Sequence, residues 1–289
     1  MTIVATPPGA DSVPEFDNGW LTGGGERSAF LSYADEASNW SDDLEKLHEE
    51  SSRTHFLDVW TRAAILARIR DLTSDAAIAD LGCSTGYLLE ELSDSHPRAT
   101  LIGIDLVASG LSKAHVLVPG ARLLRADACE LPLVDGSIDA VVSANLLEHI
   151  PDDSRALEEI ARVLRVGGSA VLVVPSGPGT FDYYDRFLGH ERRYGRGELA
   201  GKARRVGLDV VEDRYIASLL YPVFWLVKKR NRLRYGRLEG AALEQRVAQD
   251  IAGTRDSRIG HALRRLEETL ELRLPFGIRN LVVLHKRER

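Results

Sequence analysis

The stretch Ala77-Ile-Ala-Asp80-Leu-Gly82-Cys83-Ser84-Thr-Gly86-Tyr87 decides the fold of this chain. A short apolar run ends at an acid and enters a turn punctuated by two glycines, and a leucine-rich segment of helical length follows. This order predicts a strand that leads into a helix. Glycines let the backbone pass close to a ligand, and the N-terminus of the helix offers free N–H groups. We therefore expect a ligand at this turn.

Four further apolar runs follow, separated by segments of helical length: TLIGIDL, ARLLRADA, IDAVVSANLL and SAVLVVPS. Strands that alternate with helices in this way predict βαβ units and a mainly parallel sheet. Later strands are expected at 208–216 and 277–285. The predicted fold class is therefore α/β, with a doubly wound sheet.

The segments outside this core predict the domain organisation. Residues 1–28 are rich in Gly, Pro, Ser and Asp and are expected to form a flexible N-terminal lead. Residues 29–289 form one domain, in which apolar spacing over 29–70 predicts an N-terminal helical lid with a helix that starts near Ser41. Residues 217–275, rich in Leu, Arg and Glu, are expected to be a helical cap insertion beside the site.

The composition limits the class of protein. Hydrophobic residues at 44% and charged residues at 28% are typical of a globular protein. A net charge of -6 and a pI near 5.8 disfavour nucleic acid as the main partner. The spacing of Cys83 and Cys129 predicts neither a zinc site nor a disulfide, and the first residues show no secretory signal. We expect a cytoplasmic protein.

Acids end three successive predicted strands: Asp80, Asp105 and Asp127. The turn after Asp80 is not the G-x-G-x-x-G dinucleotide fingerprint, because Ser84 stands at the second glycine position. A pyrophosphate tolerates an acid there poorly, whereas the ammonium and sulfonium of S-adenosylmethionine favour it. Each acid alone fits a helix cap equally well, but the three together indicate one adenosyl ligand.

These residues and the motifs after them resemble the class I S-adenosylmethionine-dependent methyltransferases. The resemblance covers about residues 76–176 and also rests on Leu131-Pro132, Ser137-Ile-Asp139, Asn145-Leu-Leu-Glu148-His149-Ile-Pro and the helix 157–165 before Gly167-Gly168. It implies a seven-stranded Rossmann-like sheet with an antiparallel last strand. Family members commonly have glycine where this chain has Ser84, a small residue that we expect to be tolerated.

The resemblance also implies which residues bind S-adenosylmethionine. Gly82, Cys83, Ser84 and Gly86 would line its methionine end, with Asp80 reaching the ammonium through water. The remaining positions are Asp105 with Leu106 at the ribose, Asp127 with Ala128 at the adenine, and the backbone of Asn145 beneath the sulfonium. Arg62 is a candidate for the cofactor carboxylate, and an exposed helix arginine is the equal alternative.

The segment 182–194 resembles the region that overhangs the acceptor site in methyltransferases of sugar, lipid and natural-product biosynthesis. His190 is the first candidate for a general base and His149 the second. Candidate substrate-binding residues are Tyr184, Arg192, Arg193 and Tyr194. Alternatively, the arginines pair with Glu191, Asp185 or Glu198 and fix the loop, and His149 packs against the turn after its strand.

These observations predict methyl transfer to an oxygen or nitrogen of a small-molecule acceptor, in secondary-metabolite biosynthesis and without a metal. Two alternatives stay open: an enzyme acting on a peptide or a lipid-linked sugar, and a non-catalytic S-adenosylmethionine-binding module. The apolar and basic stretch 218–237 allows a membrane contact. A buried cap helix with a solvated basic end is the favoured interpretation, and a homodimer is left open.

Overall fold

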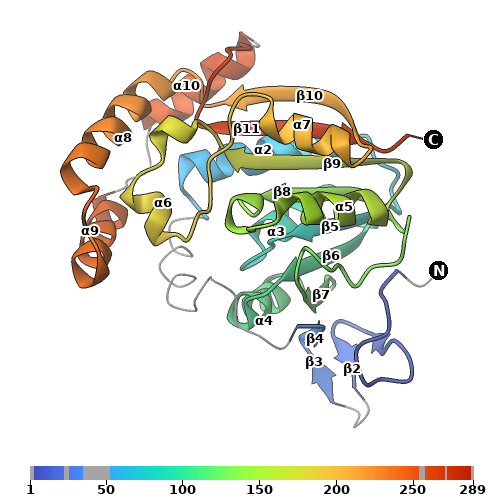
Figure 1. Ribbon diagram of the computed structural model, residues 1–289. Coiled ribbons are helices and arrows are strands. Elements are labelled where there is room, and N and C mark those ends of the chain that lie inside the picture. Colours follow the sequence, from blue (N-terminus) through green and yellow to red (C-terminus); the bar gives the residue numbers. More distant parts are fainter. Residues whose placement is uncertain (1–2, 23–25, 35–52, 254–257, 271, 288–289) are drawn as a thin grey trace.

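The computed structural model describes residues 3–22, 26–34, 53–253, 258–270 and 272–287. In these residues a central sheet lies between two layers of helices, and further helices gather at one end of the sheet, on the left of Figure 1. The strands of the central sheet are β4 (Phe30–Ser32), β5 (Ala77–Leu81), β6 (Thr100–Asp105), β7 (Arg122–Arg125), β8 (Ile138–Ala144), β9 (Leu164–Pro175), β10 (Asp209–Ile216) and β11 (Arg279–His285).

The sheet has the order β10-β11-β9-β8-β5-β6-β7-β4. β11 runs antiparallel to both β9 and β10, while the other pairs are parallel. The α/β class and the antiparallel last strand are therefore confirmed. The strand order reverses beside β5, because β6 and β7 extend to one side of it and β8 and β9 to the other. In such sheets ligands bind outside the carboxyl ends of the strands at the reversal.

Helices cover both faces of this sheet. On one face lie α2 (Phe56–Ile69), α3 (Tyr87–Ser95) and α4 (Ala108–Leu117), and on the other α5 (Asp153–Val163) and α7 (Glu198–Arg205). β5 serves both cores, because Ile78 packs with α2 and α3 whereas Ala79 and Leu81 face the side of α5. A fully buried parallel strand explains why its sequence is apolar on both faces.

The N-terminal segment differs from the prediction of a flexible lead. It contains β1 (Glu15–Phe16), β2 (Trp20–Leu21) and β3 (Arg27–Ser28), which form a small antiparallel sheet. Trp20 is 2% exposed, and its indole N–H donates to the carbonyl of Leu123 in β7. The predicted lid is only partly helical, since it begins with β4 and continues with α2. Its first helix, expected from Ser41, lies outside the described residues.

The predicted cap insertion contains α8 (Tyr221–Tyr235), α9 (Gly240–Gly253) and α10 (Arg258–Thr269). Together with α6 (Tyr183–Phe187), these helices stand at the end of the sheet to which the β5 and β8 strand ends point (Figure 1). Short 3₁₀ turns, η1 (Leu147–His149) and η2 (Pro178–Thr180), follow β8 and β9. Among the described helices, none combines the length and apolarity that crossing a bilayer requires.

Candidate active site

A cavity of about 870 Å³ opens at the carboxyl ends of β5, β6 and β8 and continues beneath α6 and α8. It brings together most of the predicted site residues. At one end the lining contains Arg62, Asp80, Gly82, Cys83, Ser84, Asp105, Leu106, Asp127, Ala128 and Asn145. At the other it contains His149, Tyr184, His190 and Arg193. Of the predicted residues, Gly86, Arg192 and Tyr194 are not part of this lining.

The turn after β5 needs its glycines for two different reasons. Gly82 has φ +74, and a Cβ on it would lie 3.1 Å from the Leu146 side chain at the cavity wall. Gly86 has φ +87, and a Cβ there would lie 2.9 Å from Cβ of Ala114 in α4. Gly86 thus lets α3 pack closely on α4. The prediction that Gly86 lines the methionine end stays a prediction beside this packing role.

Ser84 occupies backbone space that favours glycine. Its φ is +47, in the left-handed region, and Asn145 at the end of β8 has φ +55. The Ser84 N–H donates to Oδ2 of Asp105 at 2.9 Å, which holds the strained turn against the end of β6. This conformation explains why glycine is common at that position in the family and shows how serine is accommodated.

Backbone groups orient the two carboxylates at the ends of β6 and β7. Oδ1 of Asp105 accepts from the N–H of Val107 at 2.9 Å, in addition to the bond of Oδ2 with Ser84. Oδ1 of Asp127 accepts from the N–H of Cys129 at 2.8 Å. Because each carboxylate is fixed by the chain itself, both present acceptor atoms to the cavity in defined positions.

Asp80 at the end of β5 is in a different situation. It is 2% exposed, and its Oδ2 has no hydrogen-bond partner among the described residues. Burial, and then the negative charge of Asp105, raise the pKa of Asp80 to about 8. A buried carboxyl group without a cation is costly. The site is therefore suited to a ligand that brings a positive charge to Asp80, as the ammonium of S-adenosylmethionine does.

Arg62 lines the cavity but is already engaged by the protein. Its Nε donates to Glu91 at 2.7 Å, and a terminal nitrogen donates to the carbonyl of Arg53 at 2.9 Å. It is 8% exposed, so the alternative of an exposed helix arginine is wrong. A contact between Arg62 and the cofactor carboxylate stays a prediction.

The second end of the cavity, which contains His149, Tyr184, His190 and Arg193, is called the acceptor end below. It is organised around the buried Asp185 in α6. Its Oδ1 lies 2.9 Å from Nδ1 of His190 and 2.7 Å from Nε of Arg193, and its Oδ2 lies 3.4 Å from Nζ of Lys228 in α8. Burial acts to raise the pKa of Asp185, but the hydrogen bond from His190 and the charges of Arg193 and Lys228 hold it below its usual range. Nζ of Lys228 also bonds Asp182 at 2.7 Å.

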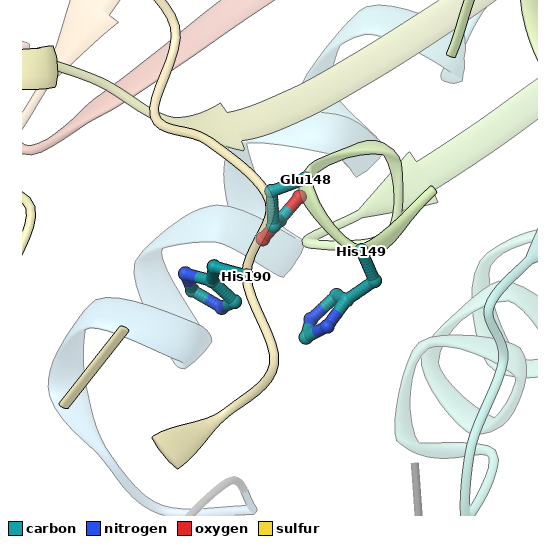
Figure 2. Close-up of side chains that lie close together, drawn as sticks. All are labelled: Glu148, His149 and His190. Carbon is teal, nitrogen blue, oxygen red and sulfur yellow. The ribbon is translucent and has the colours of Figure 1, made fainter. Parts of the chain in front are cut away.

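His149 and His190 meet at the cavity wall. Their ring centroids are 4.6 Å apart and the rings are nearly perpendicular. Figure 2 shows the carboxyl group of Glu148 beside both imidazoles, with His149 and Glu148 carried by η1 and His190 by the loop after α6. Glu148 is 0% exposed, and burial raises its pKa against the opposing charges of His190, Arg279 and Arg193.

Two predicted substrate residues have structural roles instead. Arg192 donates to the carbonyl of Pro151 at 2.8 Å and pairs with Asp153 at 3.0 Å. Tyr194 is 0% exposed, and its hydroxyl donates to Asp153 at 2.7 Å. Both therefore fix the loop to the start of α5. The alternative that the arginines pair with acids holds for Arg192 and Arg193, although the partner of Arg192 was not foreseen.

Sequence reasoning missed several residues of the acceptor end. Glu148 was quoted within a motif but given no role, although an acid inside the apolar run Leu-Leu-Glu-His-Ile signals a buried charge. Asp185 was named only as a possible partner of the arginines, and Lys228 was quoted only within the stretch 218–237. They are 43 residues apart, and nothing in the local pattern indicates that they meet.

The comparisons with known proteins agree with this geometry. Residues 79–172 match a methyltransferase domain family. An uncharacterized methyltransferase of Mycobacteroides abscessus is 32% identical over 188 residues, which are 63% of this chain and 67% of that protein. Trans-aconitate 2-methyltransferase of Deinococcus radiodurans is 36% identical over 102 residues, so that the match spans only 35% of this chain and 38% of that enzyme.

Solved structures share the fold. The methyltransferase found in complex with the Trm112 activator of Haloferax volcanii has a TM-score of 0.62 at 22% identity, covering 88% of this chain and 99% of that one. Phosphoethanolamine N-methyltransferase 2 of Haemonchus contortus, in complex with S-adenosylmethionine, has a TM-score of 0.59 at 16% identity, covering 86% of this chain and 58% of that one.

The protein has a doubly wound sheet, and a deep cavity at its strand reversal is lined by a glycine turn and strand-end carboxylates. These features define a Rossmann-like enzyme that binds an adenosyl cofactor. The chain belongs to the class I S-adenosylmethionine-dependent methyltransferases. The predicted enzyme class and the predicted cofactor are thereby confirmed. When bound, S-adenosylmethionine supplies a methyl group activated by its sulfonium.

Proposed function

We propose that the enzyme methylates an oxygen or nitrogen of a small molecule held beside His149, His190 and Tyr184, as a step of secondary-metabolite biosynthesis. One observation carries the proposal: a single cavity is lined both by the strand-end acids Asp80, Asp105 and Asp127 and by this histidine pair. At about 870 Å³ it is large enough for a cofactor and a small acceptor together. The acceptor then lies between the strand ends and the cap helices.

The chemistry asks little of the protein beyond positioning. The acceptor's lone pair forms the new bond to the methyl carbon as the carbon–sulfur bond breaks, and the electron pair of that bond stays on sulfur. A hydroxyl or amine acceptor also loses a proton, which the imidazole of His190 can take up at Nε2 as general base. Asp185 orients that imidazole through Nδ1, which leaves Nε2 for the acceptor.

A lipid-linked acceptor is the second candidate, because of the outer face of α8. Val223, Leu226 and Leu233 are 66%, 62% and 83% exposed, and cationic side chains such as Lys229 and Arg230 lie among them. Sedimentation with anionic vesicles tests this candidate. Binding that is lost in Leu226→Asp would favour it over a freely dissolved acceptor.

The function is tested by titrating the protein with S-adenosylmethionine and S-adenosylhomocysteine, and then screening hydroxyl- and amine-containing molecules for formation of S-adenosylhomocysteine. With an active acceptor, His190→Ala should lower kcat at least about tenfold while the affinity for S-adenosylhomocysteine hardly changes. His285→Ala, at a histidine on β11 outside the cavity lining, is the matched control. Unchanged turnover in His190→Ala would return His190 to a structural role.

A further inference from the structure

Glu148, His149 and His190 place one ligand atom each within 4.8 Å of one another. Two imidazoles and one carboxylate are the donor set found in catalytic zinc sites and in non-haem iron sites. All three residues line the cavity (Figure 2). The sequence analysis predicted no metal and did not consider these three residues together, since they come from two segments about forty residues apart without a spacing pattern that joins them.

Glu148 gives an independent reason to expect a cation. Its side chain is 0% exposed, and both Oε1 and Oε2 lack a hydrogen-bond partner within the described part of the chain. A buried carboxyl group normally has at least one such partner, since leaving it without one is costly. One of these oxygens lies within 4.8 Å of a nitrogen of each histidine ring, so an ion between the three residues would give it a partner.

Asp185 orients His190 for the same arrangement through a hydrogen bond with the other ring nitrogen. It accepts from Nδ1 of His190 at 2.9 Å, which fixes the tautomer that presents the Nε2 lone pair on the opposite side of the ring. Histidines that bind metals almost always donate their other N–H to a carboxylate or carbonyl in this way. Arg193, bonded to the same oxygen at 2.7 Å, holds Asp185 in place.

We propose that Glu148, His149 and His190 bind a divalent transition metal ion, of the Zn²⁺ class, at the acceptor end of the cavity. Imidazole nitrogens favour such ions over Mg²⁺ or Ca²⁺, which prefer oxygen ligands. Three protein ligands leave a coordination position that faces the cavity. The inference rests on the proposed function and changes it in one respect: Nε2 of His190 binds the ion, and the acceptor contacts the open coordination position of the ion instead of that nitrogen.

The test measures metal binding directly, without turnover. Tag-free protein is stripped with a chelator, desalted and titrated with Zn²⁺ in competition with a chromogenic chelator, and with Co²⁺ while its visible absorption is recorded. We expect one equivalent to bind with micromolar or tighter affinity. His149→Ala and His190→Ala should each weaken binding by about 100-fold or more, and Glu148→Gln and Asp185→Asn by about 10-fold or more.

Matched variants separate this site from adventitious binding. His285→Ala and Glu191→Gln change the same residue types at positions outside the cavity lining and should bind Zn²⁺ like the unchanged protein. Affinity for S-adenosylhomocysteine serves as the folding control for each variant. Absence of a stoichiometric site, or equal affinity in His190→Ala and His285→Ala, would overturn the inference.

Turnover then distinguishes this inference from the proposed function. If the metal binds as expected but no acceptor is methylated, the proposed function fails and the metal site stands. If an acceptor is methylated at the same rate after the ion has been removed and shown to be absent, the metal site has no part in activity and His190 acts alone. Loss of activity that Zn²⁺ or Co²⁺ restores would support both.

Discussion

The two ends of the cavity stabilise their carboxylates by different means. At the cofactor end, backbone N–H groups of Ser84 and Val107 hold Asp105, and these donors lie in the turns that follow the strands themselves. At the acceptor end, Asp182 and Asp185 also accept backbone N–H bonds at the start of α6, from Tyr184 and Asp182, but side-chain cations hold them in addition. Lys228 reaches them from α8, 43 residues beyond Asp185.

This difference has a functional consequence. Backbone donors persist whatever the side chain, so the cofactor end depends on the path of the chain through the β5 and β6 turns. The acceptor end depends on particular side chains and on the docking of the cap. Substitutions in α8 can therefore change acceptor binding while the cofactor site stays intact.

The largest effect is expected at the cofactor end, from Asp105→Ala. The variant loses the carboxylate that the backbone N–H groups of Ser84 and Val107 orient, and with it the predicted acceptor for the ribose hydroxyls. Charge-assisted hydrogen bonds contribute about 1.5–3 kcal/mol each, so the Kd for S-adenosylhomocysteine should rise more than about 100-fold. Calorimetric titration measures it. Asp135→Ala, at a 78% exposed side chain, is the control, and equal affinity in both variants would contradict the assignment.

At the acceptor end, Lys228→Met tests whether the cap is held by charge. Removing one partner of a buried ion pair costs about 3–5 kcal/mol, and we expect about 3 kcal/mol because Arg193 and His190 still support Asp185. Urea denaturation measures the free energy of unfolding. The neighbouring Lys229→Met, at an exposed position, should cost little. If both variants are equally stable, packing rather than charge holds α8.

Asp80 is expected to make binding of the cofactor depend on pH. A carboxyl group with a pKa of about 8 is mostly protonated at pH 7, and a bound ammonium favours the ionised form. Binding of S-adenosylmethionine should therefore release up to about one proton, which titrations in buffers of different ionisation enthalpy detect. When S-adenosylmethionine binds to the Asp80→Asn variant, up to about one proton fewer should be released than with the unchanged protein. A proton count that is the same in both proteins would show that Asp80 does not titrate on binding.

The same pKa has a consequence for stability without the cofactor. An acid whose pKa is raised by folding holds its proton more tightly in the folded than in the unfolded state. Its contribution therefore lowers stability as pH rises through the window from about 4 to about 8. Relative to Asp80→Asn, the unchanged protein should lose stability across this window, and thermal melting at several pH values measures the difference.

The smallest effect is expected from Ser84→Gly. Glycine adopts the φ of +47 at no steric cost, but it also increases the entropy of the unfolded chain. These terms oppose each other, so stability should change by less than about 1 kcal/mol and cofactor affinity by less than about threefold. Ser84→Val, which suits this φ poorly, should weaken both. Tight binding by the valine variant would show that the turn is less constrained than its geometry indicates.

The fold and the cofactor end could be predicted from the sequence because their determinants are local. Each strand, its terminal acid and the turn after it form one continuous stretch, as in Ala77–Leu81 with Gly82. Backbone geometry then places the acids together, since the carboxyl ends of parallel strands meet at one edge. The packing role of Gly86 was not foreseen, because a glycine required for helix packing looks the same in sequence as one required for ligand approach.

The acceptor end could be predicted only in part. His190, Arg193 and Tyr184 were identified from their segment, which also contains Asp185, the partner of His190 and Arg193. The approach of Glu148 and Lys228 depends on how distant elements dock. Arg192 and Arg193 are adjacent in sequence, yet one turns to Asp153 and the other to Asp185. The N-terminal segment was misjudged for a similar reason, because its Gly, Pro and Ser content conceals Trp20, whose burial depends on β7.

The short strand β4 has a consequence for how the molecule behaves at high concentration. It pairs with β7 through Phe30–Ser32, and the Trp20 indole holds the small sheet of β1 to β3 against the same strand. Without them β7 would be an edge strand, with unpaired N–H and C=O groups that invite pairing with another chain. The N-terminal segment thus leaves the three-residue strand β4, rather than β7, at this edge of the sheet, and short edge strands are one means by which proteins limit pairing with other chains.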